Sequence, residues 1–292
     1  MQEAILYQKF PSGDVQCHLC NHFCKIELDR AGKCGVRKNI GGILYALSYG
    51  KVIAEHLDPI EKKPLYRFLP GTVTYSLACP GCNFSCLNCQ NHDISQIDDY
   101  LSKINAGLPE TKPEEIIERA LQASCPSISY TYTEPTIYAE FALDCMRLAK
   151  EKELKNVWVS NGFMTGDLLA SVAPLLDAAN IDLKFFTEKH YQEICGARLQ
   201  PILDNLVRLK NYGVHLEITT LIIPTLNNNK TELSNIAKFI YQELGSDTPW
   251  HLSAFYPTYR LAELYPTKNE DISQAQEIGL GAGLKYVYAG NI

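Results

Sequence analysis

No run of apolar residues in this chain is long enough to cross a lipid bilayer, so we expect no transmembrane helix. Residues 1–8 lack both the basic and the apolar segment of a secretory leader, so a cytoplasmic location is expected. Basic runs are missing as well, and the formal net charge is -6. The sequence therefore argues against nucleic acid as a partner, because such binding depends on clustered positive charge.

Cysteine, in contrast, is plentiful, with 11 residues in the chain. In a reducing compartment this number points to metal binding or catalysis rather than to disulfides. Seven of the cysteines form two groups. One group is Cys82, Cys86 and Cys89, with three and then two residues between them.

Three thiolates can hold three of the four irons of a [4Fe-4S] cluster and leave the fourth iron open to a small molecule. An open coordination position is typical of catalytic metals, whereas structural zinc takes four protein ligands. Cys79 lies just upstream and could complete a zinc site, so zinc remains the alternative at this loop. We favour the cluster, because the spacing fits and the loop follows a predicted strand.

The spacing of Cys82, Cys86 and Cys89 resembles that of the radical S-adenosylmethionine (SAM) superfamily. The resemblance implies that the amino and carboxylate groups of SAM bind the open iron. It also implies that one electron from the cluster cleaves SAM to a 5′-deoxyadenosyl radical. In such enzymes the cofactors carry the difficult chemistry, and the protein supplies binding, orientation and shielding.

The chain divides into two regions. Residues 1–70 combine the second cysteine group with many turn residues and two predicted strands, 43–49 and 51–56. In residues 71–292, strand-like and helix-like segments alternate, which predicts an α/β fold with a parallel sheet and crossover helices. The pattern alone leaves open a doubly wound sheet and a full or partial barrel. The predicted strands are 72–78, 127–132, 156–160, 180–185, 214–223, 250–255 and 285–288, and the predicted helices are 113–123, 137–152, 166–176, 201–211, 230–244 and 270–282.

Polar residues lie at the ends of these strands, where parallel α/β folds form their sites. The residues are Glu134 after the second strand, Ser160 and Asn161 at the third, and Asp182 and Lys184 in the fourth. A carboxylate can accept from the SAM amino group, a hydroxyl or amide can bind its ribose, and a lysine can pair with its carboxylate. Each residue taken singly is more often a turn or capping residue. Their recurrence at consecutive strands predicts that they bind SAM.

Longer motifs make the resemblance more specific. Residues 160–162 and 182–184 resemble segments of the pyruvate formate-lyase-activating enzymes, in which a Gly-Gly-Glu-Pro segment contacts the SAM amine. Residues 58–71 resemble a segment of the radical SAM enzymes of the AmmeMemoRadiSam system. Further runs extend this resemblance over most of the chain. This resemblance implies a partial (β/α)6 barrel of the TIM type, preceded by a small Cys-rich subdomain. It also implies Memo-like and AMMECR1-like proteins as partners. The supporting runs are 89–95, 130–136 and 250–257.

The chain departs from these patterns at two places. Tyr132 and Thr133 replace the two glycines before Glu134, so we expect the backbone to approach SAM differently from that of the activating enzymes. Asn88 stands where the superfamily usually has an aromatic residue against adenine; an amide can bond adenine but stacks less well. His251, within a later strand, is a further candidate for the SAM pocket, with a structural histidine as the alternative.

The second cysteine group is Cys17, Cys20, Cys24 and Cys34. Four thiolates suit a closed zinc site, and they equally suit a second iron–sulfur cluster that relays electrons. Thiols without metal that form a binding face are the third option. A metal is favoured because this turn-rich region otherwise lacks a core, and zinc is slightly preferred to a cluster.

The sequence as a whole predicts a radical SAM oxidoreductase that abstracts hydrogen from an organic substrate, with a reductant such as flavodoxin or ferredoxin. One alternative keeps this chemistry but takes a protein glycine as the target, as in glycyl-radical-enzyme activation. Another alternative is a zinc-binding scaffold of a multiprotein system without redox chemistry. The substrate cannot be read from these motifs, because they specify the cofactor rather than the target.

Overall fold

The structure, a computed structural model, describes residues 1–96 and 107–292. Its centre is an eight-stranded sheet with the order β14-β13-β12-β11-β10-β9-β8-β7. All seven strands predicted after residue 71 are present in it, and their observed bounds lie within a few residues of the predicted ones. The strands are β7 (Ala54–Pro59), β8 (Val73–Ala78), β9 (Ser127–Tyr130), β10 (Lys155–Ser160), β11 (Ala178–Asp182), β12 (His215–Ile222), β13 (Trp250–Ala254) and β14 (Val287–Gly290).

Strands β8 to β14 are all parallel to one another. Strand β7 pairs with β8 in the antiparallel direction. The end strands β7 and β14 each pair with one neighbour and not with each other, so the sheet is an open, partial barrel. The predicted α/β architecture of parallel strands and crossover helices is thereby confirmed. Parallel pairing brings the carboxyl ends of β8 to β13 to one edge, where the predicted site residues lie.

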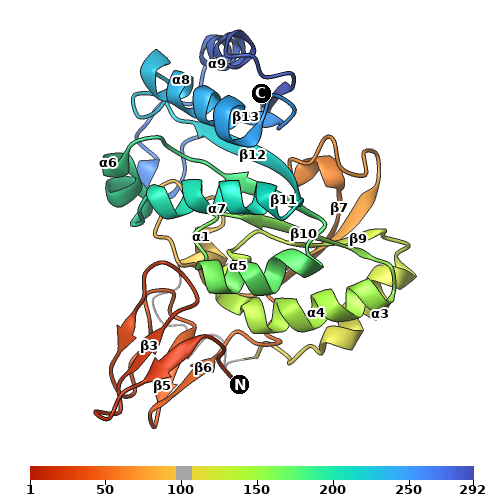
Figure 1. Cartoon of the computed structure of the whole chain (residues 1–292), viewed down its shortest axis with the longest axis vertical. Helices are drawn as coiled ribbons and strands as arrows, with labels where there is room; N and C mark the ends of the chain where they lie inside the picture. The colour runs from red at the N-terminus through yellow and green to blue at the C-terminus, as the bar shows by residue number, and fades with distance from the viewer. Residues whose placement is uncertain (97–106) are drawn as a thin grey trace.

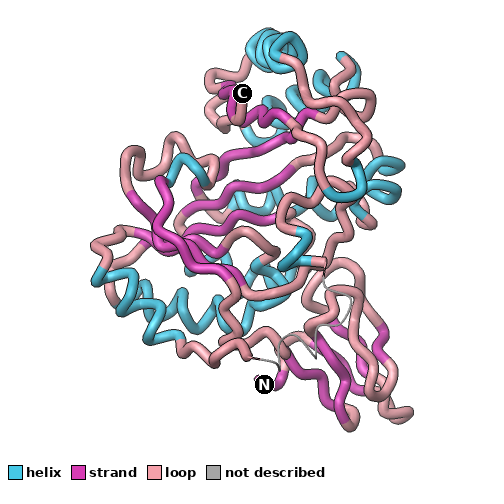
Figure 2. The backbone as a smooth tube through the Cα atoms, turned by 180° about the vertical axis from the view of Figure 1, so that it is seen from behind, coloured by secondary structure: helices cyan, strands magenta, loops and turns pink. Residues whose placement is uncertain are grey.

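The helices between the strands correspond to the predicted ones. In Figure 1, α4, α5 and α7 lie in front of the strands, and Figure 2 shows them behind the strands, so they cover one face of the sheet. Each buries one apolar face: on α3, for example, Ile116, Ile117 and Ala120 are buried. The helices are α1 (His92–Ser95), α3 (Pro113–Gln122), α4 (Ala139–Glu151), α5 (Gly166–Val172), α6 (Glu188–His190), α7 (Gln200–Asn211), α8 (Lys230–Phe239) and α9 (Asn269–Gly281).

The segment between β7 and β8 closes the amino-terminal end of the barrel. Ile60 and Leu65 pack with Val157 and Ala178 in a small apolar cluster, separate from the main core. The backbone N–H groups of the next two residues, 66 and 67, donate to the buried carboxylate of Glu217. This floor lies opposite the edge where the cysteine loop follows β8.

The amino-terminal region forms two three-stranded sheets, β1-β6-β5 and β2-β3-β4, and lies at one end of the molecule (Figure 1). An almost completely buried ion pair between Arg37 and Glu140 of α4, with 2.8 Å between Nη1 and Oε1, joins it to the barrel. Since β7 belongs to the large sheet, the division of the chain near residue 70 stays a prediction. The strands are β1 (Gln2–Glu3), β2 (Tyr7–Lys9), β3 (Val15–Cys17), β4 (Lys25–Ile26), β5 (Arg37–Ile40) and β6 (Ile43–Ala46).

Within the described ranges 1–96 and 107–292, no helix combines the length and the apolar character that a membrane crossing requires.

Candidate functional site

The loop that follows β8 carries Cys82, Cys86 and Cys89. Backbone hydrogen bonds from the residues on either side of Cys86 hold this loop in place. The N–H of Ser85 donates to the carbonyl of Cys195 at 3.0 Å, and the N–H of Leu87 donates to the carbonyl of residue 194 at 2.9 Å. The loop therefore pairs with the end of the π-helical turn η4 (Tyr191–Cys195). This pairing presents the three cysteines at the carboxyl end of the barrel, as expected.

The three thiols share a buried, mutually interacting environment. Burial, followed by the charge of Glu134, raises the pKa of Cys82 well above its usual value, and burial raises the pKa of Cys89. A hydrogen bond from Cys195 is the main cause of the lowered pKa of Cys86. The thiol of Cys89 lies 3.1 Å from the hydroxyl of Ser95. A cationic group between these sulfurs would stabilise them as thiolates.

Cys79, the candidate fourth zinc ligand, interacts with a different set of residues. It is completely buried at the end of β8, and its electrostatic neighbours include Tyr138 and Cys145. Its carbonyl oxygen accepts a 2.5 Å hydrogen bond from Thr133. The arrangement favours three thiol ligands in the loop over four.

Glu134 is the centre of the polar network at the ends of β9 and β10. Its carboxylate is almost completely buried and accepts from the hydroxyl of Ser160 at 2.8 Å and from the backbone N–H of Asn161 at 2.8 Å. It also accepts from the N–H and the hydroxyl of Thr136, at 3.0 and 2.5 Å. Burial raises the pKa of Glu134, although these hydrogen bonds oppose the shift. Two predicted residues, Ser160 and Asn161, are thus brought to the predicted carboxylate.

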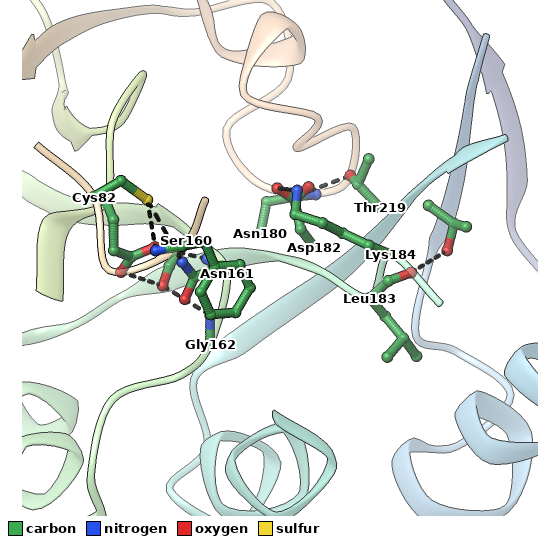
Figure 3. A network of polar contacts seen from close by, with 12 residues as sticks. Cys82, Ser160, Asn161, Gly162, Asn180, Asp182, Leu183, Lys184 and Thr219 are labelled. Carbon is green, nitrogen blue, oxygen red and sulfur yellow. Dashed lines mark hydrogen bonds and ion pairs between the residues drawn. The ribbon is translucent and has the colours of Figure 1, made fainter. Parts of the chain in front are cut away.

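The network reaches the cysteine loop through Asn161. Its amide nitrogen donates to Oδ1 of Asn83 at 2.7 Å and lies 4.0 Å from the sulfur of Cys82 (Figure 3). Gly162 follows with a φ of 71°, and a Cβ there would come 2.9 Å from the side chain of Ile181. Glycine at this position therefore lets the strand end turn tightly beside β11.

Asp182 and Lys184 form a second polar group, which Figure 3 shows beside the first with Asn180 and Thr219. Nζ of Lys184 lies 2.6 Å from Oδ2 of Asp182. Burial lowers the pKa of the Lys184 ammonium, but Asp182 and the thiols of Cys86 and Cys195 outweigh it and hold the pKa well above its usual value. Lys184 is therefore a fixed positive charge close to the cysteine loop.

Two buried polar atoms of the cysteine loop have no hydrogen-bond partner in the described part of the chain. They are Nδ2 of Asn83 and Oδ1 of Asn88. Buried polar groups are almost always paired, so both atoms point to a bound group that would complete them. Their position among the three cysteines fits a cluster with a polar small molecule beside it.

His251 lies away from this network. Its Nε2 is 2.6 Å from Oε2 of Glu217. The other carboxylate oxygen of Glu217, Oε1, is 2.9 Å from Nε2 of His215. The rings of Tyr66 and Tyr288 pack against His251. These contacts place His251 near the floor of the barrel, and its part in SAM binding stays a prediction.

The four amino-terminal cysteines lie together. Cys17, Cys20, Cys24 and Cys34 all line one small cavity, beside Leu19, Ile26 and Asn83. Burial raises the pKa of Cys34 to about 11 and that of Cys20 further. Across the described residues, no three His, Cys, Asp or Glu side chains are already arranged as ligands around one metal ion. The cysteines are therefore grouped, and a metal would draw their side chains inward.

Sequence reasoning missed two features of the site. Asn83 joins Asn161 to the loop, and only its position next to Cys82 could have indicated this role. Tyr132 adopts a φ of 61°, in the left-handed region that glycine favours, and its hydroxyl donates to Asp58. Lys63 also bonds Asp58, at 2.6 Å, and its ammonium lies 4.3 Å from the centre of the Tyr132 ring. Tyr132 therefore adopts a backbone conformation that glycine favours, and its side chain contacts Asp58 and Lys63.

Comparison with known proteins agrees with this geometry. The chain is 43% identical to the uncharacterized protein MJ0808 of Methanocaldococcus jannaschii, across 100% of the chain and 86% of that protein. It is 25% identical to the pyruvate formate-lyase-activating enzyme of Clostridium pasteurianum, across 55% of the chain and 66% of that enzyme.

Solved structures share the fold. Streptococcus suis SuiB bound to S-adenosylmethionine superimposes with a TM-score of 0.56 at 11% identity, covering 72% of this chain and 48% of SuiB. The family model "Radical SAM superfamily" matches residues 77–240, more than half of the chain, and this range includes the cysteine loop and the polar strand ends. Members of this family are enzymes that use a [4Fe-4S] cluster and SAM, which speaks against the non-redox scaffold. The chain belongs to the radical SAM superfamily.

Proposed function

We propose that this protein cleaves SAM reductively at a [4Fe-4S] cluster and abstracts hydrogen from an organic substrate. One observation carries the proposal: the cysteine loop after β8 is hydrogen-bonded, through Asn83 and Asn161, to the buried Glu134 at the next strand ends. The thiols and the polar groups proposed to bind SAM thus belong to one connected site.

Cys82, Cys86 and Cys89 would hold the cluster, and the unpaired amide atoms of Asn83 and Asn88 fit a bound group beside it. When bound, the cluster and SAM supply one-electron cleavage of the sulfonium to a 5′-deoxyadenosyl radical. The protein's contribution is to position SAM and to exclude water from the reacting atoms.

The side chains have distinct proposed roles. Glu134 aligns the ends of β9 and β10 and offers its carboxylate to the SAM amine, while Ser160 and Asn161 bind the ribose or carboxylate oxygens. Lys184, oriented by Asp182, pairs with the SAM carboxylate as a point charge. Asn88 would hydrogen-bond the adenine through its unpaired oxygen.

We further propose that the protein is the radical SAM member of the AmmeMemoRadiSam system in the cytoplasm. The support is the resemblance of residues 58–71, which form the floor of the barrel and include the Asp58–Lys63 contact to Tyr132. Its partners would then be Memo-like and AMMECR1-like proteins, with flavodoxin or ferredoxin as reductant. The metal at the amino-terminal cysteines, zinc or a second cluster, belongs to the same proposal.

Activation of a glycyl-radical enzyme is the second candidate. The similarity to the Clostridium pasteurianum activating enzyme favours it. The two candidates differ in their product, because activation leaves a radical on a partner polypeptide, whereas a small substrate is released. An electron paramagnetic resonance (EPR) spectrum of the reaction with each partner distinguishes them.

SAM binding at the cluster can be tested by EPR of the anaerobic, dithionite-reduced protein. We expect the signal of the reduced cluster to change shape when SAM is added, because SAM occupies the open iron. A Lys184→Met variant should need a higher SAM concentration for the same change. A signal that saturating SAM leaves unaltered would contradict the proposal.

A further inference from the structure

The cavity among the amino-terminal cysteines is small and has mixed walls. It measures about 10 Å³, close to the room that one water molecule needs. Apolar side chains of Leu19 and Ile26 form part of its wall, and Lys33 and Arg37 stand at its side. A single metal ion is of about the size of such a space.

Hydrogen-bond donors face the sulfurs. The backbone N–H of His22 bonds the Cys20 thiol, and that of Val36 bonds the Cys34 thiol, each two residues after its cysteine. Arg37 is 2% exposed, and its two terminal nitrogens bind Glu140 and the carbonyl of Ile5. Its Nε is buried and finds no acceptor in the part of the chain that the structure describes. Such donors suit thiolate sulfurs that carry the excess negative charge of a metal site.

We propose that Cys17, Cys20, Cys24 and Cys34 hold one zinc ion, and that this ion fixes the two loops that build the SAM site. Four thiolates give zinc a closed, tetrahedral site, which is structural rather than catalytic. His22 is not a ligand through Nε2, because that atom lies 2.7 Å from the carbonyl oxygen of Asn83. The four thiols are the complete ligand set, and their side chains turn inward when the ion binds.

The first loop fixed in this way is the cysteine loop after β8. The bond from His22 fixes Asn83, whose side chain accepts from Asn161. Gly81, directly before Cys82, has a φ of 98°, and a Cβ there would come 3.0 Å from the carbonyl oxygen of Cys34. The backbone of a zinc ligand therefore packs directly on the start of the loop.

The second loop is the one after β10, which begins at Asn161. The side-chain amide of Asn21 donates to the carbonyl of Met164 at 2.6 Å, and the hydroxyl of Thr165 donates to the carbonyl of His18 at 2.8 Å. Asn21 and His18, the two partners from the amino-terminal region, lie between proposed zinc ligands in the sequence. The ion thereby holds the segment 17–24 in the shape that receives this loop.

The zinc itself is tested on the anaerobic, cluster-loaded wild-type protein, independently of any SAM chemistry. X-ray absorption at the zinc edge should give about one zinc per chain with four sulfur neighbours at about 2.3 Å. Zinc with oxygen or nitrogen neighbours, additional iron in place of zinc, or no metal at these cysteines would overturn the proposal. Failure of the proposed SAM cleavage would leave this result unchanged.

The coupling between zinc and the SAM site needs two variants and a control. Cys34→Ser should lose the zinc and weaken SAM binding, whereas Cys125→Ser, at an isolated cysteine, should change neither. His22→Phe should keep the zinc and the packing on Phe163 but lose the bond to Asn83. We expect it to weaken SAM binding about five-fold, the worth of one hydrogen bond. SAM binding equal to the wild type in His22→Phe and in zinc-free Cys34→Ser would overturn the coupling.

Discussion

The backbone N–H of Asn161 donates a 2.8 Å hydrogen bond to the carboxylate of Glu134, 27 residues earlier in the chain. This bond ties the end of β10 to the end of β9 at the edge of the sheet that also receives the cysteine loop. Because the other carboxylate oxygen accepts from Ser160 and Thr136, both oxygens of Glu134 are occupied by donors. The carboxylate therefore shapes the site as well as offering charge to it.

Glu134→Gln should disturb this arrangement without changing its size. One carboxylate oxygen becomes an N–H donor that faces other donors, so at least one buried hydrogen bond is lost. We expect a loss of stability of about 1–3 kcal/mol and weaker SAM binding. Thermal unfolding and equilibrium dialysis with labelled SAM measure the two effects. The exposed Glu151→Gln is the control, and equal behaviour of both variants would contradict the role of Glu134.

Lys184→Met should weaken SAM binding about ten-fold, which corresponds to about 1.4 kcal/mol. The physical reason is the loss of the fixed positive charge that Asp182 orients. Lys184→Arg should restore the affinity only in part, because a guanidinium is broader than the ammonium that fits this space. Equilibrium dialysis under anaerobic conditions gives the dissociation constants. An unchanged constant in Lys184→Met would place the SAM carboxylate elsewhere.

The floor of the barrel should make stability depend on pH. Burial raises the pKa of Glu217, but hydrogen bonds from His215, His251 and the backbone of residues 66 and 67 outweigh it and lower the pKa from 4.5 to about 2. A lowered pKa in the folded state stabilises the protein above pH 4.5, and this contribution is lost as the pH falls toward 2. The loss amounts to roughly 3 kcal/mol.

Glu217→Gln should remove this part of the pH dependence. Unfolding of wild type and variant by urea, measured between pH 5 and roughly 2.5, compares the two slopes. The variant should be less stable at the upper end, and the difference should shrink toward the lower end. If the difference in the free energy of unfolding between wild type and variant stays constant with pH, folding does not lower the pKa of Glu217.

The ion pair between Arg37 and Glu140 should be essential for docking of the amino-terminal region. Both side chains are almost completely buried, so Glu140→Ala leaves an uncompensated charge and should cost about 3–5 kcal/mol. The exposed pair Arg147–Asp144 on the same helix is the matched control, and Arg147→Ala should cost less than about 1 kcal/mol. Denaturant unfolding compares the two variants; similar losses would refute the assignment.

Much of the fold could be predicted, because periodic apolar segments in alternating order allow few arrangements. The predicted start of α3 at residue 113 is also the observed one, but the contacts around this start could not be predicted. The N–H of Thr111 is bonded to the carbonyl of Gly50, and Glu115 caps the N–H of Lys112. Such long-range contacts do not appear in local sequence patterns.

The site could be predicted where motifs follow strands, and not where side chains reach across the barrel. Glu134, Ser160 and Asn161 come together because parallel strands end at one edge. The contact of His251 with Glu217 near the floor could not be predicted from its strand, and its part in SAM binding stays a prediction. The backbone of Tyr132 could not be foreseen either, because its left-handed conformation is held by distant contacts to Asp58 and Lys63.

The central claim is that Cys82, Cys86 and Cys89 hold the cluster at which SAM is cleaved. The most direct test measures 5′-deoxyadenosine formed from SAM by the anaerobically reconstituted protein with dithionite. We predict product from the wild type and from the control Cys125→Ala, and none above background from Cys86→Ala. Wild-type protein with a full complement of iron and sulfide that forms no 5′-deoxyadenosine, or a Cys86→Ala variant that forms as much as the wild type, would contradict it.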